Sequence, residues 1–412
     1  MSSSVLVLGA GMVGVCTALH LVLKGHSVVL IDRREPGRET SYGNAGIIQR
    51  EAVEPYPFPR DLATLLRVAF KRGADVNYHF SALPGLAGSL ARYWRNSGGD
   101  RYAAIAAEYA RLIGHSTSGH AQLIELAGAE DLVKREGFRF VFRDPVSLDR
   151  AAVKAARLEA THGLQYKALG GTELAAAEPS LRLPLAGALH WLDPWSVSDP
   201  GELVERYAAL FARLGGTLAR GDCASLRSTA LGWQVNADGG RLDAEHAVIA
   251  LGPWSGEILR PMGYRLPLFV KRGYHRHYRG ATGLRLPLFH ADCGLMIAPM
   301  KRGVRSTTGA EFARLDAVAT PVQMDMAEAA ARELLDLGEP VEAEPWLGAR
   351  PCTADMKPVI GGAPRHRGLW FNFGHAHQGF TLGPISGRLI AELLGEEQPV
   401  LDPTPYAAGR LL

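Results

Sequence analysis

Three glycines near the start of the chain, Gly9, Gly11 and Gly14, follow the spacing G-x-G-x-x-G, and a carboxylate follows at Asp32. Each glycine has a physical role in dinucleotide binding. Gly9 permits a tight turn, Gly11 lets a pyrophosphate approach the backbone, and Gly14 lets a helix pack close to a strand. The Asp32 carboxylate can accept hydrogen bonds from ribose hydroxyls. The pattern predicts a dinucleotide site, and the alternative is that the glycines serve only a tight βαβ turn.

The residues around these glycines have the patterns that such a site requires. Residues 5–8 and 27–31 are short apolar runs that predict buried strands. Residues 12–24 have helical character, and Gly25 is a natural place for the helix to end. A phosphate group would lie at the start of this helix, where unpaired N–H groups and the helix dipole favour negative charge.

The composition excludes several other classes of protein. The chain has 412 residues, a net charge of +3 and no basic run, which argues against a nucleic-acid partner. Its cysteines are far apart and have no metal-ligand spacing, so we predict neither a disulfide framework nor a metal site. Neither a signal peptide nor an apolar run of about 20 residues is visible. We therefore expect a cytoplasmic protein, with contact at the periphery of the inner membrane as an alternative, and leave the oligomeric state open.

Three later stretches carry a second set of motifs: VIALGPWSG at residues 248–256, GARPCTADMKPVIGG at 348–362 and FNFGHAHQGFTLGPISGRLIAELL at 371–394. Together with the opening glycines, their order resembles that of the D-amino-acid oxidase superfamily of FAD enzymes. More narrowly, the chain is similar to the bacterial D-amino-acid dehydrogenase branch, which includes D-hydroxyproline dehydrogenases. The resemblance covers nearly the whole chain and is densest at residues 5–46, 193–256, 271–275 and 348–394.

The resemblance implies that FAD binds rather than NAD. The link is expected to be non-covalent, because the spacing around Cys352 differs from that of relatives that attach the flavin to a cysteine. The start of the C-terminal helix would face the flavin pyrimidine and stabilise the negative charge of the reduced ring. An ordinary strand-to-helix turn is the alternative there. The residues implied to contact FAD are Gly9, Gly11, Met12, Val13, Gly14, Asp32, Arg33, Ser41, Asn44, Ala45, Gly46, Cys223, Ala250, Gly252, Gly379, Phe380, Thr381 and Leu382.

For the substrate, the resemblance points first to Arg350, which matches the arginine that binds the substrate carboxylate in this family. A guanidinium can hold a carboxylate by two parallel hydrogen bonds, and a structural salt bridge is the alternative. Tyr274 would hydrogen-bond the carboxylate and His275 would line the pocket, unless both are half-buried sheet residues. Of His375 and His377, one is expected beside the flavin and the other behind it, and His377 is the candidate for the site.

The predicted reaction is FAD-dependent dehydrogenation of a D-amino acid. Hydride would move from Cα to flavin N5, and a quinone or another acceptor would take the electrons. The GYH and HxHxGFT features suggest D-proline or 4-hydroxy-D-proline as the substrate. The alternatives are an FAD oxidase of glycine- or sarcosine-type amines that uses O2, and a non-catalytic flavin subunit of a heteromeric complex. A nicotinamide-dependent dehydrogenase is a more distant alternative.

The remaining elements indicate a mixed α/β fold in which a Rossmann-type FAD-binding domain is interleaved with an antiparallel-sheet substrate domain. We assign residues 1–60, 190–257 and 343–412 to the first domain and residues 61–189 and 258–342 to the second. The predicted helical stretches are residues 62–70, 83–132, 148–160, 201–214, 324–337 and 385–394. The predicted strands are residues 138–142, 217–220, 246–251 and 369–373, with a hairpin in 226–241 that turns at 238–240 and an antiparallel sheet in 264–308.

Overall fold

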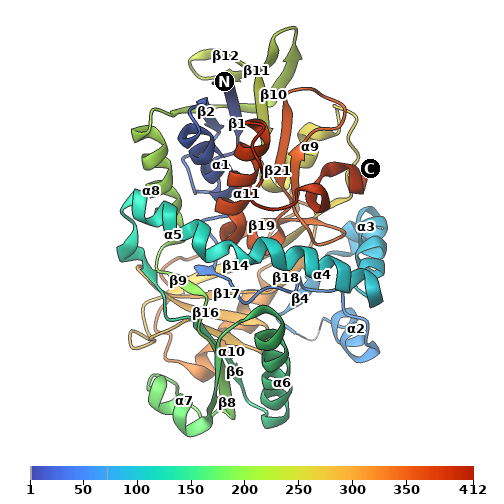
Figure 1. Ribbon diagram of the computed structural model, residues 1–412. Coiled ribbons are helices and arrows are strands. Elements are labelled where there is room, and N and C mark those ends of the chain that lie inside the picture. Colours follow the sequence, from blue (N-terminus) through green and yellow to red (C-terminus); the bar gives the residue numbers. More distant parts are fainter. Residues whose placement is uncertain (1, 72) are drawn as a thin grey trace.

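The computed structural model describes residues 2–71 and 73–412 and contains two large sheets, in the upper and lower halves of Figure 1. The first sheet has eight strands in the order β12-β11-β10-β2-β1-β13-β21-β20. Its strands are β1 (Ser4–Leu8), β2 (Ser27–Asp32), β10 (Thr217–Thr229), β11 (Gly232–Ala237), β12 (Gly240–Ala244), β13 (His246–Ile249), β20 (Val359–Gly362) and β21 (Leu369–Phe373).

The five strands β10, β2, β1, β13 and β21 run parallel. Inner parallel strands are covered on both faces, which explains why β1, β2, β13 and β21 are nearly continuous apolar runs. β10 is the exception, because most of its residues are exposed or half-buried. Helix α1 (Met12–Leu23) connects β1 to β2 and ends before Gly25, whose φ is +83°. The βαβ unit predicted from the opening stretch is therefore confirmed.

The second sheet has the order β4-β18-β14-β17-β16-β15-β6-β8-β7, with β19 paired to β14. Its strands are β4 (Val76–Tyr78), β6 (Phe138–Phe142), β7 (Tyr166–Gly170), β8 (Gly187–Trp191), β14 (Leu268–Tyr278), β15 (Leu288–His290), β16 (Leu295–Met300), β17 (Gly303–Thr307), β18 (Ala310–Phe312) and β19 (Trp346–Thr353). Most pairs are antiparallel, as predicted, but β15–β6 and β18–β4 are parallel. A small third sheet joins β3 (Ile47–Ile48), β9 (Trp195–Val197) and β5 (Val133–Lys134).

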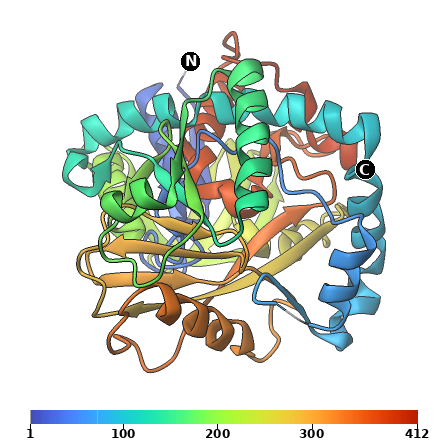
Figure 2. The ribbon, with the colours of Figure 1, turned by 90° about the horizontal axis from the view of Figure 1, so that it is seen from below.

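Helices cover the faces of both sheets. α1, α8 and α11 pack on the first sheet, and α5 packs against α8 and α11 (Figure 1). Seen from below in Figure 2, α10 covers one face of the second sheet. The helices other than α1 are α2 (Leu62–Ala69), α3 (Leu83–Asn96), α4 (Gly99–Gly114), α5 (Ser116–Ala127), α6 (Pro145–His162), α7 (Gly171–Ala177), α8 (Pro200–Arg213), α9 (Ser255–Leu259), α10 (Val322–Leu334) and α11 (Gly379–Leu394). Among the helices of residues 2–71 and 73–412, none is both long and apolar enough to cross a bilayer.

Helix α11 begins several residues before the predicted start at 385, and a tertiary contact explains the difference. Pro384 lies inside the helix and has no N–H to bond the Phe380 carbonyl. The buried His120 of α5 donates to that carbonyl from Nε2 at 2.9 Å, so the helix tolerates the proline. The predicted helix at 83–132 is likewise divided into α3, α4 and α5.

The strands of the two sheets come from different segments of the chain, and these segments can be compared with the proposed domains. The first sheet takes its strands from residues 4–32, 217–249 and 359–373. Strand β19 belongs to the second sheet, although it lies in the 343–412 segment that we assigned to the FAD-binding domain. The pairing of β19 with β14 over eight residue positions therefore moves residues 346–353 toward the substrate domain.

Candidate active site

The turn after β1 forms a narrow backbone cradle. Gly9 has a φ of +105°, and a Cβ there would lie 2.6 Å from the Ala250 carbonyl oxygen. A Cβ at Gly14 would lie 1.7 Å from the Gly9 carbonyl oxygen. No side chain fits at either position, so only glycines allow α1 to begin this close to the ends of β1 and β13.

The start of α1 suits a phosphate group. Gly11 caps the helix without a side-chain hydrogen bond, and the first turn contains no acidic residue. The Met12 N–H donates to Ser41 Oγ at 2.9 Å, which brings the loop after β2 against the helix start. Asp32 ends β2 and accepts from the Ala10 N–H at 2.7 Å. Its carboxylate therefore lies beside the same turn, where a ribose would follow the phosphates.

A cavity of about 1310 Å³ runs from this turn to the second sheet. Ordinary ligand pockets occupy roughly 300–1,000 Å³, so this one has room for a dinucleotide and a small substrate. The predicted cofactor residues that line it are Gly9, Gly11, Met12, Val13, Asp32, Arg33, Ser41, Asn44, Ala45, Cys223, Ala250, Gly252, Gly379 and Phe380. The predicted residues that lie outside its lining are Gly14, Gly46, Thr381 and Leu382. These four shape the surrounding backbone; Thr381 Oγ1, for example, accepts from the Gln49 N–H at 3.2 Å.

The far end of the cavity reaches the start of α11. This helix start has no side-chain cap and no acidic residue in its first turn. Gly379 and Phe380 line the cavity there, and His120 holds the Phe380 carbonyl from behind. The unpaired N–H groups and the positive end of the helix dipole therefore favour an anionic group at this end.

Arg350 lies at the same end, on β19, and its guanidinium covers Gly273 of the paired strand β14. A Cβ at Gly273 would lie 2.5 Å from Arg350 Nη2, so the glycine makes room for the cation. Nη1 donates to the Gly309 carbonyl at 2.7 Å, and Nη2 donates to the Thr308 carbonyl at 3.4 Å. Burial lowers the pKa of Arg350 from its ordinary value. No carboxylate of residues 2–71 and 73–412 forms an ion pair with it, so the structure does not support the salt-bridge alternative.

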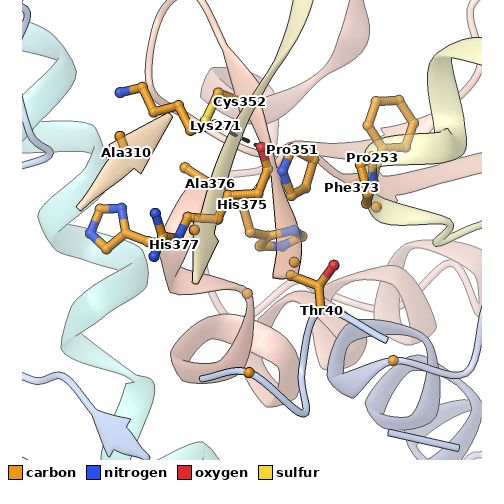
Figure 3. A pocket seen from close by; sticks show the side chains of 18 of the residues that line it. Thr40, Pro253, Lys271, Ala310, Pro351, Cys352, Phe373, His375, Ala376 and His377 are labelled. Carbon is orange, nitrogen blue, oxygen red and sulfur yellow. Dashed lines mark hydrogen bonds between the residues drawn. The ribbon is translucent and has the colours of Figure 1, made fainter. Parts of the chain in front are cut away.

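His375 and His377 line the same cavity as Arg350, and Figure 3 shows the two imidazoles. Burial lowers the pKa of each to about 3, and the charges of Arg350 and Lys271 add to the effect at His377. His377 also meets the Tyr56 ring edge-on, with 4.8 Å between the ring centres. Both imidazoles are therefore neutral at pH 7 and add no charge to the site.

The two cysteines that line the cavity are un-ionised thiols. Burial raises the pKa of Cys223 to about 12, and burial also raises the pKa of Cys352. Cys352 is only 3% exposed, and its Sγ donates to the Arg350 carbonyl at 3.6 Å. Because the thiolate is the nucleophilic form, neither residue is prepared to attack a cofactor.

Comparison with known proteins assigns the cofactor. A family profile described as DAO, FAD dependent oxidoreductase, matches residues 4–393. The chain belongs to this DAO family of FAD-dependent oxidoreductases. A D-amino acid dehydrogenase of Chromohalobacter salexigens is 30% identical over 98% of this chain and 99% of its own length. A D-amino-acid oxidase of Bradyrhizobium diazoefficiens is 28% identical over 99% of each.

Solved structures show the same fold. A glycine oxidase from Geobacillus kaustophilus covers 100% of both chains with a TM-score of 0.76 at 22% identity. The predicted FAD cofactor, the Rossmann-type mixed α/β fold and the oxidoreductase class are therefore confirmed. FAD fits the observed geometry, because the glycine cradle and the start of α1, which has no acidic residue, suit its pyrophosphate, and the uncapped start of α11 suits an anionic ring.

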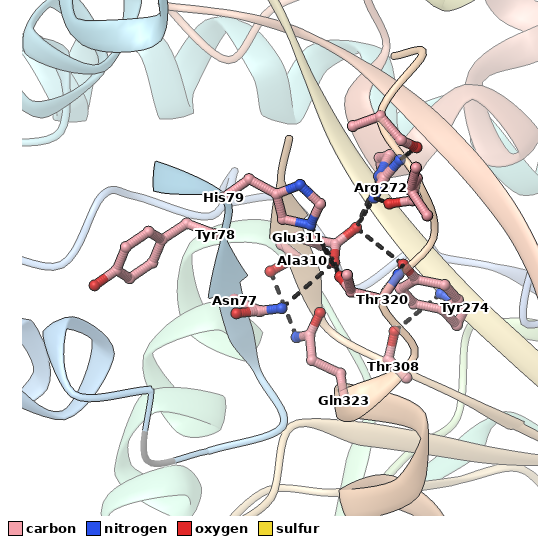
Figure 4. A network of polar contacts seen from close by, with 12 residues as sticks. Asn77, Tyr78, His79, Arg272, Tyr274, Thr308, Ala310, Glu311, Thr320 and Gln323 are labelled. Atoms are coloured by element: carbon pink, nitrogen blue, oxygen red, sulfur yellow. Dashed lines mark hydrogen bonds and ion pairs between the residues drawn. The ribbon is translucent and has the colours of Figure 1, made fainter. Parts of the chain in front are cut away.

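Tyr274 does not have the geometry predicted for a substrate ligand in this DAO-family site. It borders the cavity, but its hydroxyl donates to Glu311 Oε2 at 3.0 Å and accepts from the Thr320 N–H at 2.8 Å. Figure 4 shows this buried network around Glu311. The alternation of side chains along a strand explains the difference, because Tyr274 points away from the face of Gly273 that Arg350 covers.

His275 also differs from its prediction. Its imidazole is 1% exposed and is absent from the cavity lining. Trp346, which pairs directly with it across β14 and β19, stacks on the ring with 4.8 Å between centres. Burial, with the nearby cation of Arg305, holds the pKa of His275 well below its ordinary value. His275 is therefore a neutral packing residue behind Trp346, which itself lines the cavity.

The cavity lining also includes residues that the sequence analysis did not single out, among them Gln49, Tyr56 and Lys271. Lys271 begins the KRGYH motif, from which the sequence analysis selected Tyr274 and His275 as the substrate residues. Tyr56 lies between two prolines. Because prolines exclude regular structure, they predict a loop, and loops often carry binding residues, so this pattern could have indicated Tyr56. The Gln49 amide donates to Glu51 Oε1 at 2.8 Å and accepts from Gln378 at 2.7 Å, contacts that no sequence pattern reveals.

Proposed function

We propose that this chain is an FAD-dependent D-amino-acid dehydrogenase that delivers its electrons to a quinone or another acceptor. The observation that carries the proposal is Arg350, a half-buried cation at the α11 end of the cavity that has carbonyl partners but no carboxylate partner among the described residues. A substrate carboxylate would supply the missing charge through paired hydrogen bonds. The full-length relatives named D-amino acid dehydrogenase support the choice of substrate.

In this proposal Arg350 binds the carboxylate and thereby fixes the position of Cα. FAD, when bound, supplies the hydride acceptor. His375 and His377 are neutral and therefore do not offset the positive charge of Arg350. This charge attracts the substrate carboxylate. Aromatic side chains of Tyr56 and Phe58 line the same end and exclude water. Positioning and exclusion of water then provide much of the rate, as is common when a cofactor carries the chemistry.

Anaerobic reduction of the protein-bound flavin tests this proposal. The holoenzyme is mixed with D- and L-amino acids, D-proline, 4-hydroxy-D-proline, glycine and sarcosine, and loss of the flavin absorption is followed. We expect at least one D-amino acid to reduce the flavin much faster than its L-enantiomer. Faster reduction by L-amino acids, or reduction by none of these amines, contradicts the proposal.

The electron acceptor is tested on the same reduced enzyme. We expect rapid reoxidation by a quinone or a dye and little peroxide in air. Strong peroxide release identifies the oxidase alternative, and flavin that stays reduced with every acceptor identifies a subunit that needs a partner. We also propose a cytoplasmic location, with contact at the periphery of the inner membrane as the alternative. Cell fractionation that finds the protein elsewhere contradicts both.

A further inference from the structure

A second cation lies next to Arg350 in the cavity. Lys271 on β14 pairs directly with Arg350 on β19, and both residues line the cavity. Side chains of directly opposed residues lie on the same face of a sheet, so both cations belong to one site. The pKa of the neutral His377, which is lowered first by burial, is lowered further by both charges. Figure 3 shows Lys271 and His377 extending toward the same side of the cavity.

The surroundings of Lys271 attract a cation without neutralising it. Its Nζ lies 4.5 Å from the ring centre of Tyr93, 5.6 Å from that of Phe312 and 5.7 Å from that of Phe269. Aromatic faces stabilise an ammonium through their quadrupoles but carry no net charge. Among residues 2–71 and 73–412 no carboxylate forms an ion pair with Lys271.

The Lys271 ammonium also has more hydrogen-bond donors than the described residues have acceptors for it. An ammonium has three donors, and the acceptor that the described residues offer is the Tyr93 hydroxyl, 3.1 Å from Nζ. That hydroxyl itself donates to the Tyr56 carbonyl at 2.6 Å, so it presents a lone pair to the ammonium. The remaining donors are available to a ligand in the cavity.

The two cations lean in opposite directions along β14. The Arg350 guanidinium lies over Gly273, whereas the Lys271 ammonium lies toward Phe269. Residues 269 and 273 are on opposite sides of residue 271, so a ligand between the cations can meet one at each end. Two positive charges without a carboxylate partner among the described residues, placed in one half-buried cavity, favour a ligand with two negative charges.

We propose that Lys271 is a specificity-determining residue that binds a second carboxylate, at the end of the substrate side chain. The preferred substrates are then dicarboxylic amino acids, with the α-carboxylate on Arg350 and the side-chain carboxylate on Lys271. This inference rests on the proposed function and makes it narrower. A charge-assisted hydrogen bond in such a site corresponds to a preference of about 10- to 150-fold over a neutral side chain of the same length.

The test compares kcat/KM of the holoenzyme for D-glutamate and D-glutamine, which differ only in the charged group. We expect the wild type to prefer D-glutamate by about 10- to 150-fold. Lys271→Met should bring the ratio of the two kcat/KM values close to one, mainly through the loss for D-glutamate, and Lys271→Arg should retain much of the preference. Lys167→Met, at an exposed lysine of β7, is the matched control and should change neither value.

Two results overturn the inference. One is a wild type that uses the two substrates equally or prefers D-glutamine, which can be judged even if no variant folds. The other is a Lys271→Met enzyme that binds FAD but loses activity on both substrates equally, as a purely structural lysine would. If no amino acid reduces the wild-type flavin, the proposed function itself fails. If neutral D-amino acids reduce it without a preference for D-glutamate, only the role of Lys271 fails.

Discussion

Replacing Arg350 with methionine should weaken substrate binding strongly while the fold and the FAD remain. Methionine keeps an apolar stem and removes the charge. Truncating one partner of a buried, hydrogen-bonded charge pair costs roughly 2–5 kcal/mol. Since about 1.4 kcal/mol is a factor of ten, substrate affinity should fall about 30- to 4,000-fold.

The effect of Arg350→Met on stability should be small or favourable. Hydrogen bonds of the guanidinium to the Gly309 and Thr308 carbonyls would be lost, and bonds to charged groups contribute about 1.5–3 kcal/mol each. The Thr308 bond is long at 3.4 Å and contributes little of this. Desolvating an ion costs several kcal/mol, and no carboxylate among the described residues offsets that cost for Arg350. We therefore expect the free energy of unfolding of the apoprotein to stay constant or rise.

Anaerobic titration of the variant with the best wild-type substrate measures the loss of affinity, and denaturant unfolding measures the stability. Arg365→Met is the control, because Arg365 is exposed and packs over Tyr264 outside the cavity. It should leave the substrate Kd unchanged. The reasoning is refuted if Arg350→Met keeps its Kd within threefold of the wild type, or if it unfolds several kcal/mol more easily, as a broken structural ion pair would.

Three further predictions follow from the described geometry. Gly14→Ala places a Cβ 1.7 Å from the Gly9 carbonyl oxygen and should yield protein without flavin absorption, whereas Gly114→Ala, where a Cβ meets open space, should keep it. Burial lowers the pKa of His20 and His120 to about 4. Below about pH 6.5 the unfolded chain therefore binds more protons than the folded chain. The free energy of unfolding should then fall on acidification by about 1.4 kcal/mol per pH unit for each histidine. Denaturant unfolding at pH 5 to 7 checks this, and His20→Gln should make the fall less steep; a pH-independent free energy contradicts it. Burial raises the pKa of Glu51 to about 7. The free energy of unfolding should therefore fall as the pH rises from about 4.5 to 7, because the unfolded chain releases this proton more readily than the folded chain. Glu51→Gln should raise the melting temperature at pH 8 but not at pH 5.

Several features of this protein follow from the sequence because they depend on neighbouring residues. The turn at Gly9 and Gly14 needs glycine for steric reasons, and its flanking apolar runs fold into β1, α1 and β2 as predicted. Asp199 caps α8 by accepting from the Glu202 N–H at 3.0 Å, which a side chain three residues away can always reach. Family resemblance in the motifs was enough to identify FAD, and the family match confirms it.

Contacts between distant segments decided the rest. Arg350 is a free cation only because β19 pairs with β14 and places it over Gly273, away from every described carboxylate. With the same pairing, the Tyr274 hydroxyl points toward Glu311 and Trp346 covers His275. Neighbours in one motif thus point to opposite faces of a strand, and the partner strand determines which face meets the cavity. The motifs therefore identify the cofactor and the turn that binds it, whereas the pairing of β14 with β19 decides which side chains remain to bind the substrate.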